Sequence, residues 1–223
     1  MNREDLKKKI KEIGKKIQEV EDAFRKDKNL SDPAKALKMK EFRIRFPGGV
    51  IRTVETVKKD IPFFEEINDN EVIAANVAYL WQWIDVLEWL LFRFNLDFSA
   101  ASMACKTGLV TYAHIAAAIS TEFIRWYRKN VDPKVNLPKG FKAAIRFLNE
   151  HVFHKLQKSG FNVKGLKKDL ENLWELRNNI HIEDTKRVSK KEYREYTREE
   201  LIKARKKVER LLAALNHFYY HYQ

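Results

Sequence analysis

Three polar residues near the end of one predicted helix have types and a spacing that could support chemistry. They are Arg177, Asn178 and His181, within the stretch ELRNNIHIED. Arg177 and His181 are four residues apart, so a helix places their side chains next to each other on adjacent turns. A guanidinium is a permanent cation, and a neighbouring amide can orient an imidazole or a bound phosphate. The group therefore indicates a site that could bind an anion.

The helix that carries these residues, predicted over 166–182, is amphipathic. Its apolar residues recur at intervals of three and four and cover one side of the helix: Leu166, Leu170, Leu173, Trp174, Leu176 and Ile180. A helical projection places Arg177 and His181 inside this apolar arc. A cation and a titratable ring thus occupy positions where the pattern calls for core residues.

Two explanations for Arg177 follow, because an unpaired guanidinium is costly to bury. In the first, it pairs with an acid on a facing helix, and His181 is a neutral core histidine. The candidate acids are Asp85, Glu88 and Glu122. In the second, this part of the helix lines a cleft or a subunit junction where an anion binds.

A basic segment follows the helix. Its cations are Lys186, Arg187, Lys190, Lys191, Arg194 and Arg198. Tyrosines are interleaved with this segment or follow it: Tyr193, Tyr196, Tyr219, Tyr220 and Tyr222. Cations with stacking rings are what a single-stranded nucleic acid requires. The alternative is a solvated helix face, because several glutamates lie among these cations and could pair with them.

The composition narrows the classes of function. The 223 residues carry a formal net charge of +13, which favours a polyanionic partner, although a lysine-rich solvated exterior gives the same balance. Cys105 is the single cysteine, which excludes an intramolecular disulfide and a cysteine-based zinc cluster. The chain begins with charged residues, and its most apolar segments are interrupted by acids or too short to cross a bilayer. We expect a cytoplasmic protein without a membrane partner, a metal site or a cofactor.

The elements that must position the site are predicted to be helices. Helical periodicity and capping residues place them at 4–27, 33–45, 71–95, 99–130, 139–158, 166–182 and from 198 onward. Phe46-Pro47-Gly48-Gly49 is a clear break, and 50–67 is ambiguous. The many alanines of 99–130 predict the central helix of a bundle. The fold class is thus all-α, a helical bundle with long central helices (61–223) and an N-terminal amphipathic helical arm (1–60).

An all-helical bundle in which a late helix carries Leu176-Arg177-Asn178-Asn179-Ile180-His181 resembles the HEPN superfamily. The resemblance implies a metal-independent endoribonuclease, of toxin or defence type, that forms a homodimer with the motifs facing one cleft. It also implies that His181 is a general acid/base, that Arg177 stabilises charge on the phosphate, and that Asn178 positions the site. RNA and an antitoxin or other protein are the partners that it suggests.

Two other classes of function stay open from the sequence. The gap of three residues between Arg177 and His181 is shorter than is usual in the family, so the chain could be a non-catalytic module that binds a nucleotide or a protein. The third class is a structural or interaction protein, in which residues 4–45 form a coiled arm and Arg177 is held in a salt bridge.

Overall fold

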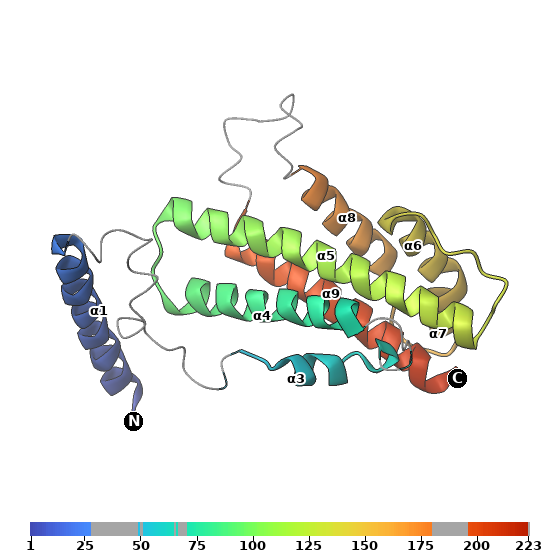
Figure 1. Ribbon diagram of the computed structural model, residues 1–223, viewed down its shortest axis with the longest axis horizontal. Coiled ribbons are helices and arrows are strands. Elements are labelled where there is room, and N and C mark those ends of the chain that lie inside the picture. Colours follow the sequence, from blue (N-terminus) through green and yellow to red (C-terminus); the bar gives the residue numbers. More distant parts are fainter. Residues whose placement is uncertain (28–48, 50, 65, 67–70, 180–195, 223) are drawn as a thin grey trace. The chain divides into compact units, whose positions relative to one another are not determined.

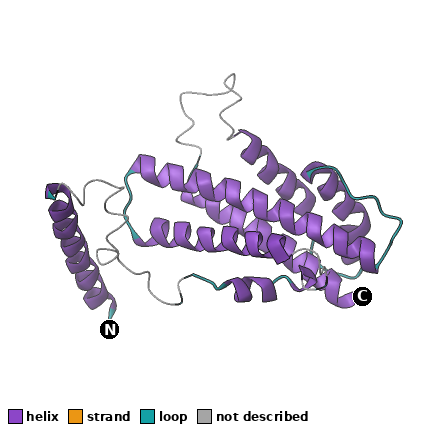
Figure 2. Cartoon of the chain, in the orientation of Figure 1, coloured by secondary structure: helices purple, strands orange, loops and turns teal. Residues whose placement is uncertain are grey.

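The structure is a computed structural model that describes residues 1–27, 49, 51–64, 66, 71–179 and 196–222. Every regular element within these ranges is a helix, which confirms the predicted all-α class (Figure 2). The predicted helix at 33–45 lies outside the described residues. In the same ranges, no helix combines the length and the apolar character that crossing a membrane requires.

The chain divides into two compact units, Met1–Pro47 and Gly48–Gln223. This division falls before the expected boundary at residue 60, because helix α3 (Val54–Lys59) belongs with the second unit. Val57 of α3 is 2% exposed and lies in the core, and α3 contacts helix α4. The short 3₁₀ turn η2 (Pro62–Phe64) continues this packing with Phe63, whose side chain is fully buried. The ambiguous stretch at 50–67 therefore contains two short helical turns that cover the bundle.

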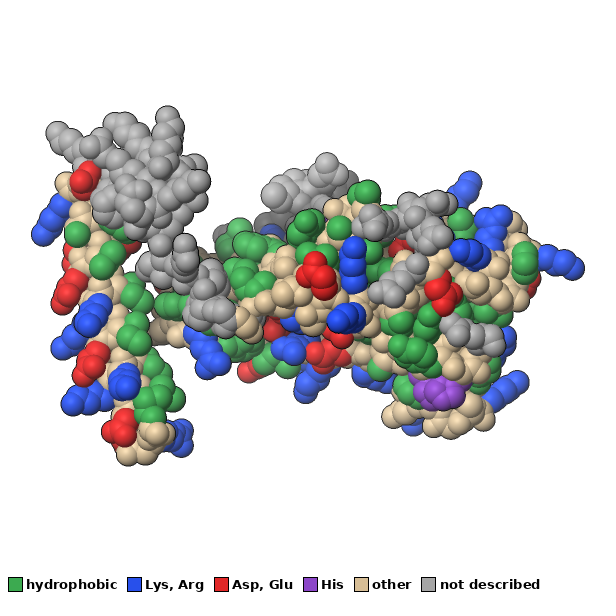
Figure 3. All heavy atoms as spheres, turned by 60° about the horizontal axis from the view of Figure 1, so that its bottom comes forward, with side chains coloured by type: hydrophobic (Ala, Val, Ile, Leu, Met, Phe, Trp, Pro, Cys, Tyr) green, Lys and Arg blue, Asp and Glu red, His purple; other side chains and the backbone are tan. Residues whose placement is uncertain are grey.

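The first unit contains α1 (Arg3–Lys26), close to the predicted span of 4–27. Its termini follow the usual electrostatics of helix ends: the Asn2 side chain accepts a hydrogen bond from the Asp5 backbone amide, and basic residues occupy the last turn. No residue of α1 is buried. Its apolar line is exposed, with Ile10 and Ile13 at 56% and 55%, and Figure 3 shows hydrophobic side chains along one side of this helix.

The second unit is built on three long helices, α4 (Glu71–Arg93), α5 (Phe98–Asn130) and α9 (Arg198–His221). They run alongside one another in Figure 1, and α5 contacts α4, α6, α8 and α9, which confirms its predicted central place. Small residues allow this close approach. A Cβ atom added to Gly108 of α5 would lie 2.6 Å from Leu201 Cδ1 of α9, so a larger residue at this position would force the Leu201 side chain to move.

The remaining helices lie along one side of α5 and position the candidate site. The predicted helix at 139–158 consists of α6 (Phe141–Leu148), the π-helical turn η3 (Asn149–Phe153) and α7 (His154–Lys158). Helix α8 (Leu166–Asn179) follows and contacts α5, α6 and α9. The predicted capping residue Thr197 begins α9, where its side chain accepts a hydrogen bond from the Glu200 amide.

Candidate anion-binding site at the end of α8

Helix α8 is anchored by the apolar face that its sequence predicts. Leu166, Leu170 and Leu173 are at most 1% exposed. Trp174, one turn before the end of the helix, packs against Phe141 of α6 with ring centres 5.1 Å apart. Because the described part of α8 ends at Asn179, Arg177 and Asn178 lie in its last turn. The helix thus holds these two residues at the edge of the core.

The guanidinium of Arg177 is held by three neutral groups. Its Nε and Nη2 atoms both lie 3.3 Å from His114 Nε2, and its Nη1 atom donates to Asn178 Oδ1 at 3.0 Å. Its Cζ atom lies 4.8 Å from the centre of the Trp174 ring, in cation–π contact. Since a guanidinium only donates, His114 Nε2 must accept and carry its lone pair, which makes the His114 ring neutral here.

In the part of the chain that the structure describes, Arg177 has no carboxylate partner. The three candidate acids are engaged elsewhere. Asp85 binds the Arg52 guanidinium through both carboxylate oxygens, at 3.0 and 2.7 Å, and Glu122 binds Arg125 at 2.7 Å. The first of the two explanations, a salt bridge between Arg177 and one of these acids, is therefore wrong.

The third acid, Glu88, is shared between two donors. It accepts hydrogen bonds from Tyr112 at 2.7 Å and from Arg205 at 2.8 Å. Burial, and secondarily the charge of Glu88, hold the pKa of Tyr112 well above its ordinary range, so the phenol remains a donor. This carboxylate is thus occupied by α5 and α9, and it is not available to α8.

His114 is the functional candidate that the sequence pattern did not reveal. It lies on α5, in the apolar stretch Ala113 to Ile119, and its ring reaches Arg177 across 63 positions of sequence. The available signal was that His114 is the one titratable residue in this stretch of alanines and isoleucines. The periodicity of α5 explains the alanines as packing positions, but it does not indicate which helix a polar residue among them faces.

The structure places Asn178 beside Arg177 and describes few of the other predicted site residues. His181 and five of the six basic residues lie outside the described residues: Lys186, Arg187, Lys190, Lys191 and Arg194. Arg198 is described, and it lines a separate hollow between α5 and α9. Among the tyrosines predicted to stack on bases, Tyr196 and Tyr219 are 5% and 9% exposed. The rings of these two are therefore mostly buried and present little surface for stacking on a base.

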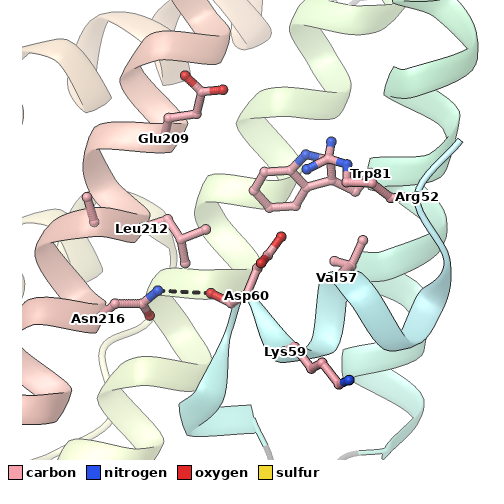
Figure 4. A pocket seen from close by; sticks show the side chains of 9 residues that line it. Arg52, Val57, Lys59, Asp60, Trp81, Glu209, Leu212 and Asn216 are labelled. Atoms are coloured by element: carbon pink, nitrogen blue, oxygen red, sulfur yellow. Dashed lines mark hydrogen bonds between the residues drawn. The ribbon is translucent and has the colours of Figure 1, made fainter. Parts of the chain in front are cut away.

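A second hollow, of about 480 Å³, lies between α3, α4 and α9 (Figure 4). Figure 4 shows the Arg52 guanidinium over the ring of Trp81, with its Cζ atom 5.1 Å from the ring centre. Across the hollow, Asn216 Nδ2 donates to the carbonyl oxygen of Asp60 at 2.9 Å. Arg52 is already paired with Asp85, so its charge is less available to an external anion than that of Arg177.

Comparison of the chain with family models, with curated proteins and with solved structures gives no match. The resemblance to HEPN proteins therefore depends on the Arg177–His181 stretch and on the all-helical architecture.

Proposed function

We propose that the second unit is a HEPN-like endoribonuclease that binds RNA through Arg177 and cleaves it without a metal ion. The observation that carries this proposal is the set of neutral partners around the guanidinium, namely His114, Asn178 and Trp174. A cation held by neutral groups keeps its net charge for a ligand, whereas one in a salt bridge does not. The RNA backbone supplies the matching anion.

The Arg177 guanidinium is held in an orientation that suits a phosphate. Trp174 and His114 fix the plane of the guanidinium, so less conformational entropy is lost when it binds. An arginine binds a phosphate through two parallel hydrogen bonds, and these strengthen as charge develops on the phosphate during cleavage. The exposed amide of Asn178 lies beside this fork, where it could orient the same phosphate.

In this proposal His181 is the general acid/base, one helical turn after Arg177 in the sequence. It removes the proton from a ribose 2′-hydroxyl, and the 2′-oxygen forms a bond to phosphorus. The bond from phosphorus to the 5′-oxygen then breaks, and that oxygen receives a proton. The products are a 2′,3′-cyclic phosphate and a free 5′-hydroxyl. We further propose that two copies of the chain form the cleft, in the cytoplasm, and that an antitoxin or other protein controls the activity.

The test is cleavage of mixed RNA by the purified chain in excess EDTA. We expect wild-type cleavage with cyclic-phosphate ends, and a loss of at least about 100-fold in His181→Ala, the usual contribution of a general acid/base. Arg177→Lys keeps the charge but loses the fork, so it should also cleave poorly. His154→Ala and Arg128→Lys are matched controls, because both residues are exposed on other helices and should be dispensable.

Two results would contradict the nuclease proposal: no cleavage by the wild type, or full cleavage by His181→Ala. The short gap between Arg177 and His181 favours one alternative in that case, a non-catalytic module that binds a nucleotide or RNA. It predicts binding that weakens in Arg177→Lys and with rising salt, without any cleavage. Absence of both cleavage and binding would leave the structural or interaction class.

A further inference from the structure

A hollow of about 420 Å³ lies between the first turns of α5, the turn that precedes them and the beginning of α9. Most of its wall is apolar and is formed by Leu96, Phe98, Ala101, Cys105 and Tyr196. Its volume is in the range of pockets that hold small organic molecules. We call it the Arg198 pocket, after its one cationic lining residue among those that the structure describes.

Arg198 is placed unusually for a cation. Its Nε atom is buried and has no hydrogen-bond partner, and within residues 71–179 and 196–222 no carboxylate pairs with its guanidinium. A buried donor without an acceptor costs free energy, and native proteins rarely leave one unsatisfied. The pocket is therefore lined by a cation that has no acceptor among the described residues.

The nearby thiol does not supply the missing negative charge. Cys105 is 1% exposed, and burial raises the pKa of its thiol, although the Arg198 charge acts in the opposite direction. The thiol is thus neutral near pH 7, and its side chain contributes an apolar surface. Tyr196 presents its ring in a similar way, covered on another side by the ammonium of Lys106, whose Nζ lies 5.5 Å from the ring centre.

We propose that the Arg198 pocket binds a small organic anion with an apolar body, such as a medium-chain carboxylate. The carboxylate pairs with the Arg198 guanidinium, and the chain lies against Leu96, Phe98 and Ala101. Both halves of the ligand are necessary, because the pocket is mostly apolar and its cation has no carboxylate partner among the described residues. The inference is independent of the ribonuclease proposal, since it uses neither Arg177 nor any of the groups around it.

Glu199 is the group that opposes such a ligand. Its exposed carboxylate also lines the pocket, so its negative charge repels an anion at the rim. Glu199 and Arg198 therefore provide a test of the proposal, because their charges should affect anion binding in opposite directions. Removal of the Arg198 charge should weaken binding, whereas removal of the Glu199 charge should strengthen it.

The experiment is a titration of the full chain with octanoate, with 1-octanol and with acetate. Binding is measured by isothermal titration calorimetry and by NMR shifts of the methyl groups that line the pocket. Octanoate should bind at one saturable site. 1-Octanol lacks the carboxylate and acetate lacks the long alkyl chain, so both should bind at least ten times more weakly. Arg198→Met should lose at least ten-fold in octanoate affinity, Arg198→Lys should lose less, and Glu199→Gln should gain. Arg177→Lys should bind octanoate like the wild type.

Ala101→Leu supplies a variant that leaves both charges in place. The larger side chain fills the apolar part of the pocket and should also abolish octanoate binding, while thermal unfolding by circular dichroism verifies that each variant is folded. The proposal is overturned if 1-octanol binds as well as octanoate, if no saturable binding occurs, or if folded Arg198→Met or Ala101→Leu binds octanoate with unchanged affinity.

Discussion

The Arg177 side chain at the end of α8 donates to His114 Nε2 in the middle of α5, at 3.3 Å. Two nitrogen atoms of the guanidinium share this one acceptor, so the imidazole fixes the plane in which the guanidinium lies. His114 is therefore a positioning residue for Arg177 in the proposed function.

Replacement of His114 should loosen Arg177 and lower activity without removing any proposed catalytic group. In His114→Leu we expect RNA affinity or cleavage to fall about ten-fold, the effect of losing about 1.4 kcal/mol. His114→Gln should retain more activity, because a glutamine oxygen can also accept. The Nε–H resonance of Arg177 gives a second measurement, since its exchange with water should be faster in His114→Leu. Unchanged activity together with unchanged exchange would contradict this role.

Substitution of Arg177 should cost little stability, because no described acid is left unpaired. For Arg177→Ala we expect a decrease in the free energy of unfolding of about 1 kcal/mol, from the lost hydrogen bonds and the cation–π contact. A buried salt bridge would instead cost about 3–5 kcal/mol on losing one partner. Urea unfolding of wild type and variant measures the difference. A decrease in the higher range would show that a carboxylate pairs with Arg177.

Glu66 joins the segment after α3 to the bundle. Its carboxylate accepts hydrogen bonds from Trp126 Nε1 of α5 at 2.7 Å and from the Tyr219 hydroxyl of α9 at 2.5 Å. In Glu66→Gln one acceptor oxygen becomes an NH₂ group that faces donors, so we expect a loss of about 1–3 kcal/mol in the free energy of unfolding. Glu209→Gln is the control, because Glu209 is exposed and forms an exposed salt bridge with Arg205, and it should change little.

His217 should make the stability of the bundle depend on pH. Desolvation, and secondarily the neighbouring His221, lower the pKa of His217, whose ring lies between Phe161 and His221 at centre distances of 4.4 and 4.0 Å. A lowered pKa means that the unfolded chain binds the proton more readily. This contribution is thus complete above the unfolded pKa of about 6.5 and is lost as the pH falls through the lower folded value.

We therefore expect the urea midpoint of the wild type to decrease between pH 7.5 and pH 5.5, and the decrease to be smaller in His217→Gln. His154→Gln, at an exposed position on α7, should behave like the wild type. An equal decrease in all three proteins would assign the pH dependence to other groups.

Helix formation was predictable because it depends on neighbours in the sequence. The line Leu6, Ile10, Ile13 identifies α1, and the cap at Thr197 identifies the start of α9. The same local pattern revealed that Arg177 occupies an apolar face. The α3–η2 region was ambiguous, because its turns are short and are stabilised by packing against the bundle and by the contacts of Glu66.

The sequence by itself thus determined the helices, the all-α class and the types of side chain that lie at the end of α8. Only the tertiary structure decided which side chains meet: Arg177 with His114, Asp85 with Arg52, and Tyr219 with Glu66. The physical reason is that helical periodicity determines the face on which a residue lies, whereas its partner depends on how separate helices are rotated and aligned. Burial of Tyr196 was decided in the same way, as was the place of Arg198, whose Nε has no hydrogen-bond partner among the described residues.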